Sequence, residues 1–257
     1  MFQYLSPQFI HKAILKKQML DELRDYPRVI SQMLMAEHGN GIIRGTGISW
    51  DNERLSIAPG LLVHRGNIYR METEYRLRCS FVDRLTYLKV RFMTSTGEKG
   101  LSGSIGEIYY DEYPAEREEI ELGRFRLQEG ARLRTEYESV EDYQTEFDTL
   151  NRIHMPWVCP GGIGLWPKLL LDYGKELLNT GTDNPVDISL AMQLLGNHGE
   201  VSGELLLWYI KQITGESFQE ADNGKVYSRL LRILRGRKNG QKELGERERK
   251  TKQMLLI

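Results

Sequence analysis

The sequence predicts an α+β protein with an N-terminal helix, then an antiparallel β-sandwich or open barrel, then a C-terminal helical bundle. Apolar residues recur at spacings of three and four from about residue 8 to residue 37 and again after about residue 138, which is the period of amphipathic helices. Between these stretches, short runs rich in Tyr, Ile, Val and Phe alternate with turn residues. Their spacing of about 8–15 residues is typical of a sandwich or barrel and differs from that of a βαβ sheet.

The composition is that of an ordinary globular protein of 257 residues, with 40% apolar and 28% charged residues and a net charge of −1. The longest apolar runs, such as residues 205–210, are far shorter than the roughly 20 residues that cross a membrane. The start of the chain lacks the basic and apolar regions of a signal peptide. Two cysteines, Cys79 and Cys159, are too few for a disulfide framework or a zinc–thiolate site. We therefore expect a cytoplasmic protein with no membrane span, no metal and no cofactor.

The N-terminal stretch predicts a helix from about Gln8 to Glu37. Ser6 is suited to cap its start, with Pro7 at the first helical position. Pro27 is expected to break or kink the helix near Asp25, because proline lacks the backbone N–H that a helix needs. One helix face carries a stripe at spacings of three and four that is apolar except for Lys17, and it comprises Phe9, Ile10, Ala13, Ile14, Lys17, Leu20 and Leu23.

The residues that follow predict a series of short strands. Glycines interrupt the first strand, Gly41–Trp50, and turns at Pro59-Gly60 and Arg65-Gly66-Asn67 separate later ones. The further predicted strands cover residues 55–58, 61–64, 68–71, 75–81, 85–94, 106–113 and 120–127.

The C-terminal half predicts helices joined by a Pro-rich loop. A helical period returns at residues 138–150, and residues 156–167 are expected to form the loop. Asn184, which precedes a proline, and Ser202 are suited to cap helix starts, and Gly215 is suited to end a helix. The predicted helices cover residues 168–179, 185–195, 202–214 and 225–234.

These elements divide the chain into four parts. They are an N-terminal helical segment (1–38), a β-rich domain (39–137), a helical domain (138–235) and a charged C-terminal tail (236–257). The boundaries follow from where the hydrophobic period changes between helix and strand. The tail is expected to be frayed or to order on binding a partner.

Charge is distributed unevenly along the chain. Residues 107–146 contain 13 acidic and 5 basic residues, a balance of −8, and residues 235–252 contain 8 basic and 3 acidic residues, a balance of +5. Either these are two solvated faces, or the two regions meet in neighbouring copies or partners. The basic segment lacks aromatic residues for base stacking, so a nucleic-acid role is the weaker hypothesis.

Two residue clusters could carry chemistry, and each has a structural alternative. A glycine cluster follows a helix and enters a strand, which is the reverse order of a phosphate-binding loop and favours close backbone packing. It comprises Gly39, Gly41, Gly45 and Gly47. Glu119 and Glu121, next to Glu118, would share one strand face, either as an acid–base pair or as a solvated surface. The five histidines show no metal-ligand spacing.

The loop at residues 155–167 is the most unusual stretch, because it holds Cys159 and two of the four tryptophans, Trp157 and Trp166. His154 lies beside it, so a cysteine nucleophile activated by this histidine is one interpretation. No third residue that would orient the histidine can be identified. The alternative is an interdomain plug or a docking surface, because tryptophan is favoured at interface hot spots.

One stretch resembles a pattern found in structural proteins of phage tails and contractile injection systems, in which a helix ends in His-Gly, a glycine-bearing strand follows, and a hairpin contains a Pro-Gly turn. Here the helix runs into His38-Gly39 and the strand is Gly41–Gly45. The hairpin spans Leu55–Val63 and Gly66–Tyr69, and the match covers about 35 residues, or about 14% of the chain. A β-shell followed by a helical bundle is also similar to the trimeric adapter of type VI secretion baseplates.

The resemblance implies a non-catalytic structural subunit, a baseplate or adapter protein, that acts through protein–protein interfaces. It implies a homo-oligomer, expected to be a trimer, whose partners are other baseplate, tube or sheath proteins, with no small-molecule substrate. The N-terminal stripe could pack on the chain's own β-domain or against the same helix of another copy. We expect interface residues at Phe9, Ala13, Leu20, Leu23, Trp157 and Trp166. Two alternatives stay open, namely a small cytosolic enzyme that uses His154 and Cys159, and a nucleic-acid-associated protein that uses the basic tail.

Overall fold

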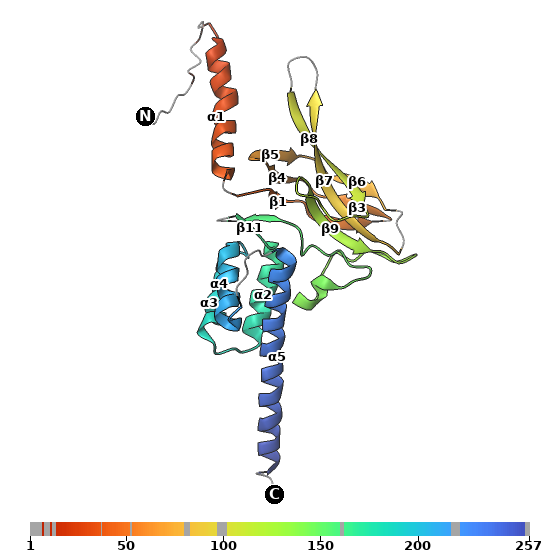
Figure 1. Ribbon diagram of the computed structural model, residues 1–257, viewed down its shortest axis with the longest axis vertical. Coiled ribbons are helices and arrows are strands. Elements are labelled where there is room, and N and C mark those ends of the chain that lie inside the picture. Colours follow the sequence, from red (N-terminus) through yellow and green to blue (C-terminus); the bar gives the residue numbers. More distant parts are fainter. Residues whose placement is uncertain are drawn as a thin grey trace.

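The computed structural model describes residues 7, 11, 14–36, 38–51, 53–79, 83–96, 102–159, 162–216 and 222–254. Along the chain, a helix is followed by strands, a short 3-10 helix, a two-stranded hairpin and a set of helices. This order confirms the predicted α+β class. The N-terminal helix projects from one end of the molecule and the last C-terminal helix from the other, and most of the strands lie to one side of these two helices (Figure 1).

Helix α1 (Lys17–Met35) is shorter than predicted and continuous. Residues 14–16 are not helical, and Lys16 precedes the helix without a side-chain capping bond. The helix passes through Pro27, so the predicted break near Asp25 is wrong. Proline lacks a backbone N–H, so one carbonyl group in the preceding turn has no helical hydrogen bond. No residue of α1 is buried, so water can bond to this carbonyl group. The capping residue and the first part of the predicted stripe, namely Ser6, Phe9, Ile10 and Ala13, lie outside the described residues.

The described strands form three open sheets. They are β1 (Gly41–Gly45), β2 (Ile48–Asp51), β3 (Arg54–Ile57), β4 (Gly60–His64), β5 (Asn67–Met71), β6 (Tyr75–Arg78), β7 (Leu85–Thr96), β8 (Ser102–Asp111), β9 (Ile120–Arg126), β10 (Trp157–Cys159) and β11 (Gly162–Gly164). The first sheet has the order β11-β10-β1-β4-β5, the second β2-β3-β6 and the third β8-β7-β9. The strands before residue 127 therefore follow the predicted series closely.

Strand pairing is antiparallel except where the chain returns to the first sheet. There β10 joins β1 in parallel, with Ile42 opposite Trp157, and the Ile42 N–H donates to the Pro156 carbonyl at 2.8 Å. The predicted loop at residues 156–167 is thus wrong, because β10 and β11 form a hairpin that extends this sheet. The hairpin forms because β1 offers a strand edge, which is a tertiary feature that local sequence does not contain.

Among the described residues, one helical element, η1 (Val140–Gln144), precedes this return and four follow it: α2 (Pro167–Asn179), α3 (Pro185–Gly196), α4 (Gly203–Thr214) and α5 (Asn223–Met254). The predicted caps are confirmed, because Val186 N–H donates to Asn184 Oδ1 at 2.9 Å and Leu205 N–H donates to Ser202 Oγ at 3.2 Å. Gly215 ends α4 with a φ of +75°. Only η1 is helical within the helix predicted over residues 138–150, because Thr149 and Asn151 instead form bridges to the β-region.

Two hydrophobic cores hold the molecule together. The core of the sheets includes Ile42, Leu55, Ile57, Leu88, Val90, Ile120, Leu122 and Phe125, and that of the helices includes Leu169, Leu170, Tyr173, Leu177, Leu194, Ile210, Leu230 and Leu234. Trp166 packs against both cores. The β-region and the helical region are therefore joined by shared packing as well as by the chain itself.

Helix α5 is much longer than predicted and continues to Met254, where the sequence suggests a frayed tail. Three ion pairs tie it to the body at the start of the basic segment: Arg235–Glu141 at 2.7 Å, Arg237–Asp187 at 2.7 Å and Lys238–Glu176 at 2.6 Å. Arg235 belongs to the basic stretch and Glu141 to the acidic stretch. The two oppositely charged regions therefore meet at this point within one chain.

Candidate interaction surface and polar cavity

Helix α1 presents an exposed apolar face, which we name the α1 stripe and define as Leu20, Leu23, Tyr26, Ile30, Met33 and Leu34. At 3.6 residues per turn, these positions cover about 140° of the helix circumference. The exposed fraction of their side chains runs from 37% for Tyr26 to 72% for Met33. This is the pattern of a helix face that normally packs against apolar neighbours, although no residue of α1 is buried in this chain.

A polar contact joins α1 to the rest of the chain. Gln32 Nε2 donates to Asn67 Oδ1 at 2.7 Å, at the start of β5. Gln32 lies about 170° around the helix from the centre of the α1 stripe. Leu20 and Leu23, two of the predicted interface residues, therefore face away from this contact. In Figure 1, one end of α1 lies close to the sheets and the rest of the helix projects beyond β1.

The two predicted interface tryptophans pack against other parts of this chain, and only Trp166 contacts both the core of the sheets and that of the helices. Trp157, on β10, is 7% exposed and packs in the core of the sheets. Trp166 is half-buried and directly precedes α2. The guanidinium carbon of Arg152 lies 4.4 Å from the centre of the Trp166 ring. These positions favour the interdomain plug over a docking surface, and a contact of either tryptophan with a partner stays a prediction.

Arg152 is a buried cation at this junction, and sequence analysis did not single it out. It is 3% exposed, and its Nη2 donates to the Thr46 carbonyl at 3.1 Å. Burial lowers the pKa of Arg152 to about 10, because desolvation disfavours the charged form. The guanidinium stays protonated at neutral pH and links the β1–β2 corner to the chain that leads into α2. In the sequence, this arginine has no local pattern that distinguishes it from a surface residue.

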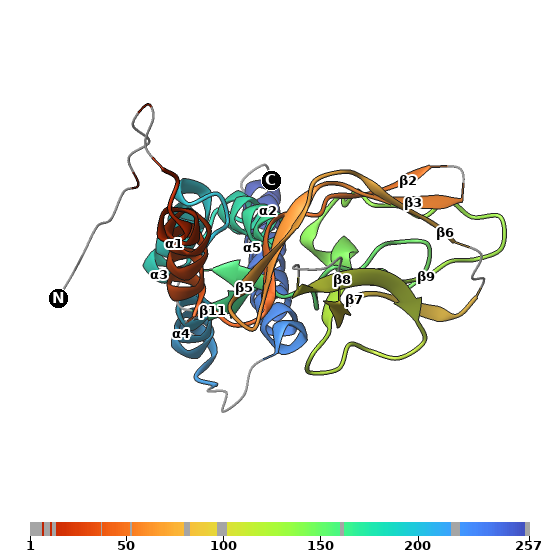
Figure 2. The ribbon, with the colours of Figure 1, turned by 90° about the horizontal axis from the view of Figure 1, so that it is seen from above.

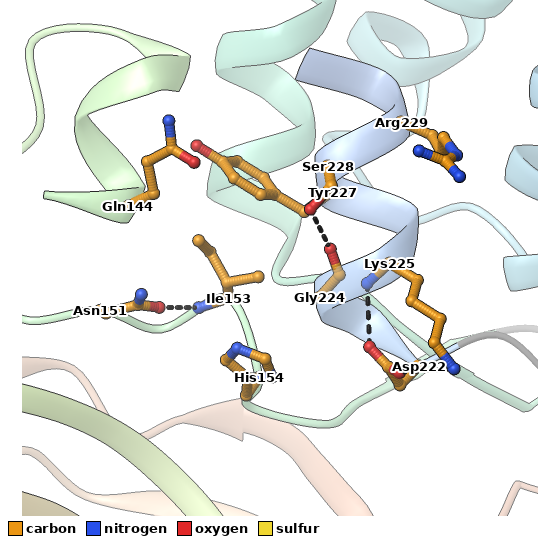
Figure 3. A pocket seen from close by; sticks show the side chains of 10 residues that line it. All are labelled: Gln144, Asn151, Ile153, His154, Asp222, Gly224, Lys225, Tyr227, Ser228 and Arg229. Atoms are coloured by element: carbon orange, nitrogen blue, oxygen red, sulfur yellow. Dashed lines mark hydrogen bonds and ion pairs between the residues drawn. The ribbon is translucent and has the colours of Figure 1, made fainter. Parts of the chain in front are cut away.

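A polar cavity of about 580 Å³ lies where the start of α5 meets residues 144–154 (Figure 3). His154 faces the first turn of α5, where a Cβ atom added at Gly224 would lie 2.6 Å from its Cε1 atom. Burial lowers the pKa of His154, which keeps the imidazole neutral at neutral pH. Asp222 is occupied as a helix cap, because it accepts from the Lys225 N–H at 2.8 Å. Burial would raise the pKa of Asp222, but its hydrogen bonds to the backbone N–H and the side chain of Lys225 lower this pKa.

Cys159 is placed differently from its proposed catalytic partner. It lies on β10 and is 4% exposed, and its Sγ donates to the Gly162 carbonyl at 3.6 Å. Among the described residues that line the polar cavity, His154 is present and Cys159 is not. Burial raises the pKa of the Cys159 thiol, and a protonated thiol is a poor nucleophile. The placement therefore weighs against the proposed pairing of His154 with Cys159.

The three candidate carboxylates each have a cationic partner. The pairs are Glu118–Arg65 at 2.9 Å, Glu119–Lys89 at 2.7 Å and Glu121–Arg124 at 2.7 Å. Lys89, only 1% exposed, also bonds Asp111 at 2.8 Å. Burial would lower the pKa of Lys89, but its two carboxylate partners outweigh that effect and raise it. The carboxylates thus neutralise cations on the sheet, and they are not arranged as an acid–base pair.

Within the glycine cluster, Gly45 allows close packing between β1 and β4. A Cβ atom added at Gly45 would lie 2.2 Å from the Pro59 carbonyl oxygen, and Gly45 has a φ of +78°.

Within the described ranges, no three His, Cys, Asp or Glu side chains are grouped as a metal site. Likewise, no helix in the described part of the chain is long and apolar enough to cross a membrane.

Comparisons with known proteins give faint structural likenesses. No protein-family model matches the sequence. No curated protein matches it either. Among solved structures, the crystal structure of TssK is 11% identical with a TM-score of 0.40, over 90% of this chain and 69% of that chain. A chain of the type VI secretion system TssK-TssF-TssG baseplate subcomplex is 9% identical with a TM-score of 0.41, over 91% of this chain and 100% of that one. A chain of the type VI secretion baseplate complex is 9% identical with a TM-score of 0.35, over 91% of this chain and all of that one.

Proposed function

We propose that this chain is a non-catalytic structural subunit of a phage-like contractile injection machine, a baseplate or adapter protein that acts through protein–protein interfaces. The α1 stripe carries this proposal. It is an apolar face of a helix that holds to its own chain through a polar bond between Gln32 and Asn67. A contiguous exposed apolar face marks an interaction site in a globular protein.

The resemblance of residues 38–69 to structural proteins of contractile machines supports the specific role. In the structure this stretch forms β1 to β5, in which β4 pairs with both β1 and β5. The assembled particle would be cytoplasmic, with the chain present as a homo-oligomer, proposed to be a trimer. Its proposed partners are other baseplate, tube or sheath proteins.

The internal contacts of the chain make the alternative functions weaker. The thiol of Cys159 is buried and the candidate carboxylates are paired with cations, so an enzyme would have to use other groups. The first three cations of the basic segment pair with carboxylates of the same chain. A nucleic acid would have to compete with these ion pairs.

A tagged full-length chain, recovered from its native cell with the co-purifying proteins identified, tests the proposal. We expect tube, sheath or spike proteins of a contractile machine to accompany it. The matched variants are Leu23→Glu, in the α1 stripe, and Arg28→Glu, on the opposite side of the same helix. Recovery of the chain alone at low salt would overturn the proposal, whereas loss of partners with Leu23→Glu but not with Arg28→Glu would show that assembly with them depends on the stripe.

A further inference from the structure

We propose that the α1 stripe packs against the same stripe of other copies of this chain, so that the α1 helices form a parallel bundle. The inference rests on the homo-oligomer of the proposed function. It adds that the α1 stripe is the surface that joins the copies and that the α1 helices run parallel. It excludes a different protein, or the chain's own body, as the main occupant of the stripe.

The width of the α1 stripe indicates more than one neighbouring helix. Leu20, Leu23, Ile30 and Leu34 follow alternating spacings of three and four when Pro27, which lies among them on the same face, is counted, and Leu23, Tyr26, Ile30 and Met33 do so directly. Each set is a seam for one partner helix, and the two seams share Leu23 and Ile30. A helix in a bundle of three or more contacts two neighbours and needs two such seams, whereas a two-stranded coil needs one.

Charges at the edges of the stripe favour a parallel arrangement. Glu22 and Arg24 flank the stripe on opposite edges, about 90° and 110° from its centre, and about 3 Å apart along the axis. In a closed ring of parallel helices, each edge meets the opposite edge of its neighbour, which places Glu22 beside Arg24. Antiparallel helices would bring like edges together. Arg24 is 67% exposed and bonds Asp25 in the free chain, so exchanging one exposed carboxylate for another costs little.

The position of α1 in the molecule leaves room for such a bundle. Seen from above, α1 lies at the margin of the molecule, on the side of α3 and α4 and away from the β2-β3-β6 sheet (Figure 2). In Figure 1 its long axis points away from β1 and from the C-terminal helices, and Figure 2 shows it well to one side of the β7–β8 hairpin. Several copies can therefore bring their α1 helices together while their sheets stay apart. The bond between Gln32 and Asn67 lies on the other side of the helix and is kept.

Disulfide crosslinking of full-length single-cysteine additions tests the orientation. Leu20→Cys and Leu34→Cys, each alone, should form crosslinked dimers under mild oxidation, because a parallel bundle places equivalent residues together. The two positions are about 21 Å apart along the helix. An antiparallel pair would instead crosslink only when the two variants are mixed. Arg28→Cys, about 150° from the centre of the stripe, should not crosslink. The unmodified chain gives the background from Cys79 and Cys159, which are both buried.

Molar mass measured by light scattering separates failure of this inference from failure of the proposed function. The double variant Leu23→Glu/Ile30→Glu should fall from the oligomer to the monomer with an unchanged circular dichroism spectrum of the body. An oligomer that persists in this variant, with no crosslinks at residues 20 and 34, would overturn the bundle and keep the homo-oligomer. A wild-type chain that is monomeric at micromolar concentration would overturn the homo-oligomer as well.

Discussion

Helices α1 and α2 are both amphipathic, yet their apolar faces have opposite environments. Helix α2 buries Leu169, Leu170, Tyr173 and Leu177 in the helical core, whereas α1 buries no residue. Gly174 explains part of the close packing of α2, because a Cβ atom there would lie 3.2 Å from Leu194 Cβ on α3. The comparison shows that apolar periodicity identifies a helix face that is suited to packing against other apolar side chains. The periodicity does not show whether those side chains belong to the same chain.

The largest expected difference between the two helices is in the stability lost when a leucine is replaced by alanine. Leu177→Ala should lower the free energy of unfolding by about 3–5 kcal/mol, because it opens a cavity in a fully buried site. Leu23→Ala, at a side chain that is 49% exposed, should change the stability of the monomer by less than about 0.5 kcal/mol. Urea unfolding of both variants at low concentration measures the difference. Equal losses would show that the chain itself covers the stripe.

A second prediction concerns the polar centre of the helical region. Asp187 is fully buried and accepts from Arg237 Nε at 2.7 Å, from Tyr209 at 2.9 Å and from Thr182 at 2.8 Å. Asp187→Ala should lower the free energy of unfolding by about 3 kcal/mol, because it leaves buried donors without an acceptor. Thermal unfolding measures the change, with exposed Asp183→Ala as the matched control. A loss no greater than that of the control would mean that α5 docks without this carboxylate.

A third prediction compares two carboxylates with similarly lowered pKa values. The Arg134 guanidinium holds the pKa of Asp142 at about 2, and Arg24 holds that of Asp25 at about 2. A folded-state pKa below the ordinary value stabilises the fold above about pH 4 and loses that contribution as the pH falls through about 2. Asp142 is only 13% exposed, so Asp142→Asn should remove about 1–2 kcal/mol of stability at pH 7.

Asp25→Asn is the control for this prediction, because Asp25 lies on exposed α1 and should leave the global unfolding midpoint unchanged. Unfolding curves recorded from pH 7 to pH 2 should converge for wild type and Asp142→Asn at the acid end. A gap between the two that stays constant over this range would mean that Asp142 acts through its hydrogen bonds and not through its charge.

The smallest expected effect is on thiol chemistry. Because burial raises the pKa of Cys159, a mild alkylating agent at pH 7 should label it only when the protein unfolds. Mass spectrometry of the native and the urea-treated chain measures the labelling. Fast labelling of Cys159 in the native chain would restore the enzyme hypothesis. Such labelling would also show that the β10–β11 hairpin opens readily.

Local signals were sufficient for the strands before residue 127 and for the caps of α3 and α4, because turns and caps depend on neighbours in the sequence. They failed at Pro27, at residues 145–151 and at the β10–β11 hairpin. At the last two, the backbone bonds partners far along the chain, such as Ile42 for β10 and Arg124 for Asn151. Leu20 and Leu23 are exposed, and their contact with a partner stays a prediction, while Arg152 and the polar cavity carry no sequence signal.

The sequence by itself determined the order of helix, strands and helices, since hydrophobic period and turn chemistry act over a few residues. It also determined that α1 has an apolar face. Only the tertiary structure decided which apolar faces find a partner within the chain, because burial depends on what the fold brings alongside each face. It likewise decided that Arg235 meets Glu141, although 94 residues separate them. Contacts of this kind are set by the packing of whole elements, and local sequence does not encode them.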